Sequence, residues 1–246
     1  MNGLNFKNMQ KSTYKKVLLY SGGLDSWLIR HIWKPDICIY VDMETEYSEL
    51  EKLRLPSDVT IVKLPLVQYS LPNSIIPLRN VYLYLQACNI TEFESVEICL
   101  GALNGDRIND KSKRFIKLLN KLLKFLYLPQ QSQPGRKVRA VMPFKDYSKR
   151  ELLEIYIREG GKLETAFYES FSCYHPENYS PCLNCKACFR KCIPFIVAGM
   201  RFTDTQRAKI KDYMERVVLK NMDDYTKNKG KEGKDCLRAI EIIKTW

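Results

Sequence analysis

Short apolar runs and longer segments with helical spacing alternate along the first two thirds of the chain. The short runs predict five strands, at 15–20, 37–43, 59–65, 96–103 and 138–144, and the second of them is rich in β-branched residues. The longer segments predict helices at 24–33, 48–55, 79–90, 111–128 and 148–161. Because parallel strands are joined through crossover helices, this order predicts an α/β fold with a doubly wound, parallel, five-stranded, Rossmann-like sheet.

Two of the predicted helices carry further detail. Ser148 and Glu151 have the spacing of a capping box, which predicts a helix start at that point. In the helix at 111–128, one apolar stripe is expected to face the core, and it consists of Phe115, Leu118, Leu119, Leu122 and Leu126.

The character of the chain changes after about residue 162. A cysteine-rich stretch is followed by a basic, helical region. We therefore expect three parts: an α/β domain at 1–162, a small cysteine-rich subdomain at 163–200 and a basic helical extension at 201–246.

The stretch YSGGLDSW, residues 20–27, joins the first predicted strand to the first predicted helix. Glycines at such a turn let the backbone approach an anion, and the following helix directs its N–H groups toward it. Ser21 and Ser26 add hydroxyl donors, and Asp25 fits beside phosphates if it holds Mg²⁺. Ligands of parallel sheets bind at the carboxyl ends of the strands, so the turn predicts a phosphate site there.

The net charge of +12 says little about the kind of partner that the protein binds. It favours anionic partners such as nucleotides or nucleic acid, although a solvated basic surface explains it equally well. The sequence contains neither a secretory signal nor an apolar run of membrane-spanning length, so we expect a cytoplasmic protein without a membrane partner.

Nine cysteines in a reducing compartment favour metal binding or buried thiols over disulfides. Cys173, Cys182, Cys185 and Cys188 have the spacing C-x8-C-x2-C-x2-C, which predicts a structural Zn²⁺ site. A second interpretation stays open, because the last three of these and Cys192 follow the run C-x2-C-x2-C-x3-C, which is typical of iron–sulfur clusters.

The turn SGGLDS resembles the signature of the PP-loop ATP pyrophosphatases, which cleave ATP between the α- and β-phosphates and adenylate a substrate oxygen. Together with the cysteines, further segments resemble the 7-cyano-7-deazaguanine synthases of this superfamily. These segments are LLYSGGLDS, IPLRNVYLYLQA, ICLGALNGD, MPFKDYSKRELLEIYIREG and SCYHPENYSPCLNCKAC, in the family's order over about residues 15–198.

The resemblance implies a C–N-bond-forming ligase that converts 7-carboxy-7-deazaguanine and ammonia to 7-cyano-7-deazaguanine. It implies ATP, Mg²⁺ and Zn²⁺ as cofactors and a homodimer. The implied nucleotide site consists of Leu19, Tyr20, Ser21, Gly22, Gly23, Leu24, Asp25, Ser26, Arg79 and Asn80. The implied catalytic residues are Asp25, Ser26 and Lys149, and the implied substrate contacts are Asn104 and Asp106.

Two other functions remain open from the sequence. The segment after the fourth strand, NGDRINDKSKRF, departs from the family's pattern, so the substrate could differ. One alternative is a tRNA-modifying PP-loop enzyme of the thiolase kind, which could carry an iron–sulfur cluster. The other is a related PP-loop protein that attaches a deazaguanine to a macromolecule. A nucleic-acid partner is thus compatible with the chain but not required by it.

Overall fold

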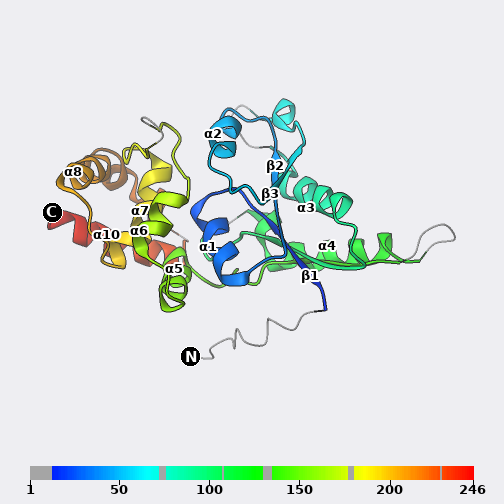
Figure 1. Ribbon diagram of the computed structural model, residues 1–246. Coiled ribbons are helices and arrows are strands. Elements are labelled where there is room, and N and C mark those ends of the chain that lie inside the picture. Colours follow the sequence, from blue (N-terminus) through cyan, green and yellow to red (C-terminus); the bar gives the residue numbers. More distant parts are fainter. Residues whose placement is uncertain (1–12, 72–75, 107, 130–134, 177–179, 228) are drawn as a thin grey trace.

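The centre of the protein is one parallel sheet of five strands, described here from a computed structural model (Figure 1). The structure describes residues 13–71, 76–106, 108–129, 135–176, 180–227 and 229–246. The strands lie in the order β3-β2-β1-β4-β5. Their bounds are β1 Lys15–Leu19, β2 Ile37–Asp42, β3 Val59–Lys63, β4 Ser95–Leu100 and β5 Lys137–Val141. The order reverses between β1 and β4, which confirms the predicted doubly wound fold.

Successive strand residues point to opposite faces, so each strand contributes to two apolar cores. One core receives Leu18, Tyr20, Cys38, Tyr40 and Cys99. The other receives Val17, Leu19, Ile39, Val41, Val96, Ile98 and Leu100. Both faces are therefore covered, which explains why these strands read as continuous apolar runs.

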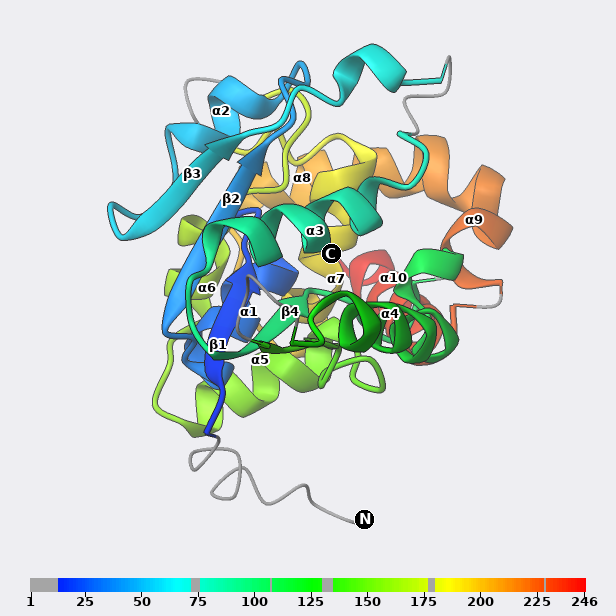
Figure 2. The ribbon, with the colours of Figure 1, turned by 90° about the vertical axis from the view of Figure 1, so that its right-hand side faces the viewer.

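Different helices cover the two faces (Figure 2). Helices α3 (Arg79–Ile90) and α4 (Lys113–Leu126) cover one face. Helices α1 (Leu24–Trp33), α5 (Lys149–Arg158) and α6 (Leu163–Glu169) cover the other. The short α2 (Ser48–Lys52) follows β2.

The second face carries a further layer of helices from the last part of the chain. This layer consists of α7 (Lys186–Val197), α8 (Asp204–Tyr213), α9 (Met222–Thr226) and α10 (Lys231–Lys244). Apolar side chains of these helices, such as Phe195 and Ile240, belong to the same core cluster as α1 and α5. The C-terminal helices thus pack directly on the α/β part of the molecule (Figure 1).

The predicted elements are present, and the corrections concern details. The capping box of Ser148 and Glu151 is confirmed, since both of its hydrogen bonds are formed. The strand predicted at 96–103 ends at Leu100, and the one predicted at 138–144 ends at Val141. The loop that follows β4 then contributes Gly101 and Asp106 to the cavity described below.

The predicted stripe of α4 is wrong for three of its residues. Leu118, Leu122 and Leu126 are about half exposed, whereas Leu119 and the unpredicted Leu123 are buried. The apolar face of this helix is wide, running from Phe125 and Leu118 round to Leu123 and Ile116, so its sequence does not say which part of that face the sheet will cover. None of the helices in the described ranges is long and apolar enough to cross a membrane.

Candidate active site

A cavity of about 690 Å³ opens at the carboxyl ends of β1, β2 and β4. It lies beside the point where the strand order reverses, which is where parallel sheets of this kind bind ligands. Its volume falls in the range of pockets that hold a nucleotide-sized molecule. The predicted glycine-rich turn forms one wall of the cavity.

The turn between β1 and α1 is held in shape by its own serines. Ser26 Oγ accepts a hydrogen bond from the Ser21 backbone N–H at 3.2 Å and donates to the Gly23 carbonyl at 3.1 Å. The two hydroxyls lie 3.1 Å apart. Gly22 has φ of +72°, a left-handed conformation in which any other residue would be strained. These hydrogen bonds and the left-handed glycine define the shape of the turn.

The N-terminus of α1 is free to bind an anion. Its N-cap is Gly23, and in the part of the chain that the structure describes no side-chain hydrogen bond caps the helix. The first amides of a helix have no partners within the helix, and the helix dipole adds partial positive charge there. These amides lie beside the cavity, since Leu24, Asp25 and Ser26 all line it. The arrangement fits the phosphates of a nucleotide.

Asp25 forms an ion pair with Lys149 of α5, although the two lie 124 positions apart in the sequence. Burial disfavours the Lys149 ammonium, but the carboxylates of Asp25 and Glu232 outweigh this effect and raise its pKa. Lys149 is therefore a cation, and only 16% of its side chain is exposed. The carboxylate of Asp25 could hold Mg²⁺ if Lys149 moved to another anionic partner.

Most of the residues predicted to bind the nucleotide or substrate, or to take part in the chemistry, line this one cavity. They are Leu19, Tyr20, Ser21, Gly23, Leu24, Asp25, Ser26, Arg79, Asn80, Asp106 and Lys149. Gly22 lies at the turn itself, and its carbonyl accepts a hydrogen bond from the Phe171 N–H at 2.8 Å. That bond ties the turn to the cysteine-rich segment.

Of the two residues predicted to contact the substrate, only Asp106 lines the main cavity, although both line a second one. Asp106 lies in the main cavity, where Lys111 pairs with it at 3.3 Å. Burial raises the pKa of Asp106, but Lys111 and the Leu103 N–H outweigh burial and lower it overall. Asn104 lines a different cavity, of about 400 Å³, and its side-chain oxygen accepts the Lys231 N–H at 2.9 Å.

Another part of the lining of the main cavity is aromatic and acidic. Tyr40 donates to Glu51 at 2.7 Å, and burial raises the pKa of Glu51. Nearby, the rings of Tyr47 and Tyr174 lie 5.3 Å apart. A flat base could stack on such side chains, so this part has the character of a nucleobase site.

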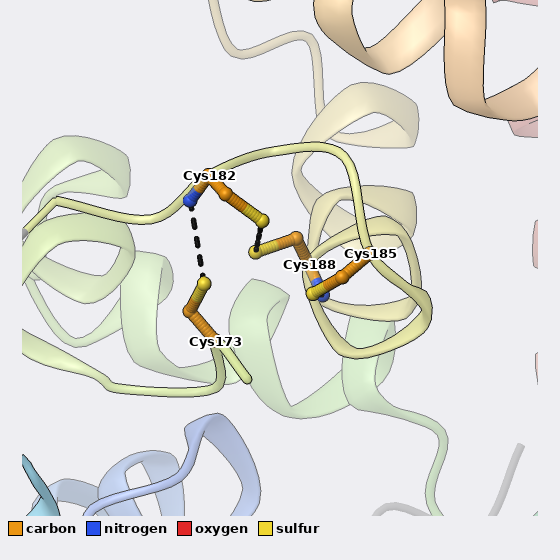
Figure 3. Close-up of side chains that lie close together, drawn as sticks. All are labelled: Cys173, Cys182, Cys185 and Cys188. Carbon is orange, nitrogen blue, oxygen red and sulfur yellow. Dashed lines mark hydrogen bonds between the residues drawn. The ribbon is translucent and has the colours of Figure 1, made fainter. Parts of the chain in front are cut away.

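The four predicted cysteines converge on one point (Figure 3). The sulfurs of Cys173, Cys182, Cys185 and Cys188 all lie within 4.8 Å of one another, and all four residues are buried. The Cys182 and Cys188 sulfurs are 3.9 Å apart. A Zn–S distance of about 2.3 Å implies a tetrahedron with edges of about 3.8 Å, so the donor set fits a tetrahedral metal ion.

Cys192 is not part of this cluster. It lies in α7 and is fully buried in the apolar core, where burial raises its pKa to about 12. The four cysteines of the run that ends at Cys192 therefore do not come together around one point. His175 is exposed and lies outside the group as well.

Sequence reasoning missed two cations that follow the cysteines. Arg190 and Lys191 both line the main cavity. Lys191 is buried and donates to the Phe167 and Ser170 carbonyls at 2.6 Å each, and burial lowers its pKa to about 8. A basic pair that begins two residues after Cys188 was the available signal, but only the fold shows that both residues reach the cavity.

Comparison with known proteins shows the family of the chain that forms this site. Residues 39–198 match the sequence model of the family described as "Queuosine biosynthesis protein QueC". The chain belongs to this family. The match extends from β2 to the end of α7 and so includes all four clustered cysteines, whereas the serine–glycine turn precedes it and α8–α10 follow it.

Individual relatives with known names share only about a quarter of their residues with this chain. A 7-cyano-7-deazaguanine synthase of Chlorobium phaeobacteroides is 24% identical over 222 residues, which cover 76% of this chain and 94% of that protein. The protein of the same name from Chlorobaculum tepidum is also 24% identical and covers 76% and 93%. That of Methanococcus aeolicus is 28% identical over 131 residues, which cover 51% of this chain and 53% of the relative. The relatives are thus named as enzymes.

Proposed function

We propose that the protein converts 7-carboxy-7-deazaguanine and ammonia to 7-cyano-7-deazaguanine at the expense of ATP, as a carbon–nitrogen ligase. The observation that carries this proposal is the serine–glycine turn at the end of β1, which lines a nucleotide-sized cavity in a QueC-family chain. The names of the relatives support the choice of substrate.

ATP would supply adenylation: first of the carboxylate, so that ammonia displaces AMP and leaves an amide, and then of the amide oxygen, so that loss of a second AMP leaves the nitrile. Ser21, Ser26 and the α1 amides would bind the phosphates. Asp25 would hold Mg²⁺, and Lys149 would turn from Asp25 toward the negative charge that develops on the phosphates. Arg79 and Asn80 would contact the nucleotide from the other wall.

For the cysteine cluster we propose Zn²⁺ with a structural role. Four buried sulfurs would complete its coordination and leave no open position for a reactant. The cluster would hold the segment of Phe171 against the turn, through the bond from the Phe171 N–H to the Gly22 carbonyl. The metal would thus support the nucleotide site without taking part in the reaction.

The test is a reaction that contains the protein, ATP, Mg²⁺, ammonium and 7-carboxy-7-deazaguanine, analysed by mass spectrometry. We expect AMP, pyrophosphate and the nitrile, with the amide as a transient species. Release of AMP without the amide or the nitrile would retain the ATP chemistry and reject the substrate. A visible absorption band with bound iron and sulfide would instead favour the tRNA-modifying alternative.

A further inference from the structure

The C-terminal helix α10 reaches the active site, although it lies beyond the segment that matches the QueC family. Its first turn contacts the start of α5, which carries Lys149. The Lys231 ammonium pairs with Glu151 at 2.8 Å. Asp235 accepts from the Ser148 hydroxyl at 3.1 Å and from the Arg150 guanidinium at 2.7 Å. These contacts fix the first turn of α10 relative to α5.

The same turn also packs against the loop after β4. The Asn104 side-chain oxygen accepts the Lys231 N–H at 2.9 Å. Gly105 approaches α10 so closely that an added Cβ would lie 2.5 Å from a carboxylate oxygen of Glu232. The loop that carries Asp106 into the main cavity is thus seated on the first turn of α10.

Between these anchors, Glu232 inserts its carboxylate among the active-site cations. It lies 3.7 Å from the Lys149 ammonium and 3.9 Å from the Arg190 guanidinium. Only 14% of its side chain is exposed. Lys149 and Arg190 both line the main cavity, whereas Glu232 lines a small neighbouring cavity of about 30 Å³ that shares these two cations. Glu232 therefore lies behind the cations as seen from the main cavity.

The position matters because Lys149 has two acidic neighbours. Within the described residues, its ion pairs are those with Asp25 and Glu232. If Asp25 turns to Mg²⁺, the buried ammonium loses its nearest partner, and a buried charge without a partner is costly. Among the described residues, Glu232 is the other carboxylate that pairs with Lys149, so it can keep the ammonium charged and anchored from behind while Lys149 turns toward the phosphates.

We propose that Glu232 is a positioning residue of the active site, which holds Lys149 and Arg190 from behind and so frees Asp25 to bind Mg²⁺. The inference rests on the proposed function of the cavity as an Mg²⁺–nucleotide site. It gives the C-terminal extension a role in the reaction of this chain.

The test compares Glu232→Gln with wild type and with Glu241→Gln, a control on the same helix whose side chain is 71% exposed. Calorimetry measures the binding of a non-hydrolysable ATP analogue at increasing Mg²⁺ concentrations, and steady-state kinetics measures kcat and the KM for ATP. For Glu232→Gln we expect the Mg²⁺ concentration at half-saturation to rise about tenfold, because Lys149 then competes for Asp25 without a second carboxylate. The KM for ATP should rise more than kcat falls, and Glu241→Gln should match wild type.

Thermal melting separates this role from a merely structural one. If Glu232 only anchors α10, Glu232→Gln will melt at a lower temperature while its Mg²⁺ dependence stays that of wild type, and the proposal is then overturned. Should Glu232→Gln fail to fold, Glu232→Asp replaces it: a shift of the Mg²⁺ dependence in the same direction supports the proposal, and none overturns it.

Wild-type turnover distinguishes this inference from the proposed function. A wild-type protein that binds Mg²⁺ and nucleotide but leaves 7-carboxy-7-deazaguanine unchanged would refute the substrate alone, and the Glu232 comparison would still decide the inference. A wild-type protein that binds no nucleotide would overturn both.

Discussion

Asp25 brings two segments of the chain together at the cavity. Its own position follows from the turn after β1, but its partner Lys149 begins α5. Lys149 in turn contacts Glu232 from the last helix. The charged centre of the proposed site is therefore a row of side chains from three distant segments, and each charge depends on its neighbours for its place.

We expect Asp25→Ala to lower turnover by on the order of a hundredfold or more, because Mg²⁺ and the phosphates would lose a preorganised carboxylate. The fold should persist, since Lys149 keeps Glu232 as a partner. AMP release measures the effect, and a circular dichroism spectrum checks the fold.

The matched control is Asp58→Ala. Asp58 also pairs with a cation, Arg30, but 67% of its side chain is exposed and it does not line the cavity. Activity close to wild type in Asp25→Ala, or an equal loss in the control, would contradict the assignment of Asp25.

The cysteine-rich segment and α7 act together as an element that supports the site. Cys185 is the N-cap of α7, and its sulfur accepts from the Cys188 N–H at 3.4 Å. The helix that follows carries Arg190 and Lys191 to the cavity wall. A metal at the cluster would thus fix the start of the helix that supplies these two cations.

We expect Cys185→Ser to lose the metal and to lower the melting temperature by about 10 °C, because metal binding contributes folding free energy to the segment. Metal content by mass spectrometry and thermal melting measure both effects.

Cys192→Ser is the matched control, since Cys192 is a buried cysteine of the same helix that lies outside the cluster. It should lose some stability through the buried hydroxyl but retain one metal ion per chain. Equal metal loss in the two variants would argue for the iron–sulfur run that includes Cys192.

At the level of the whole molecule, one apolar core joins parts that the sequence suggested as separate. Phe195 of α7 packs against Phe167 of α6 with ring centroids 5.1 Å apart, in the cluster that also contains Leu28 and Ile240. The boundaries near 162 and 200 stay a proposal, and so does a homodimer. The shared core leads us to expect that the three parts unfold together.

Phe195→Ala tests this expectation. The variant should lose about 3–5 kcal/mol of unfolding free energy through the lost apolar contacts and the cavity left behind. Urea unfolding should remain a single transition by both circular dichroism and tryptophan fluorescence. Two separated transitions would show instead that the C-terminal helices fold independently of the sheet.

Much of the fold and part of the site were predictable because they depend on local patterns. Strand runs, the capping box of Ser148 and the glycines of the turn are read from neighbouring residues. The exposed face of α4 was not predictable, since Leu122 and Leu123 are equally apolar and only the sheet decides which one is covered. The position of Glu232 beside Lys149 could not be predicted from the sequence, because nothing distinguishes this residue from other acidic residues in a charged segment.

The amino-acid sequence determined the alternation of strands and helices, the serine–glycine turn and the supply of thiols. These follow from residue spacing and from the chemistry of single side chains. Only the tertiary structure decided that Cys173 rather than Cys192 completes the cluster, that Lys149 meets Asp25, and that α10 closes the back of the site. Each of these choices depends on which distant segments pack together, and that is a property of the whole folded chain.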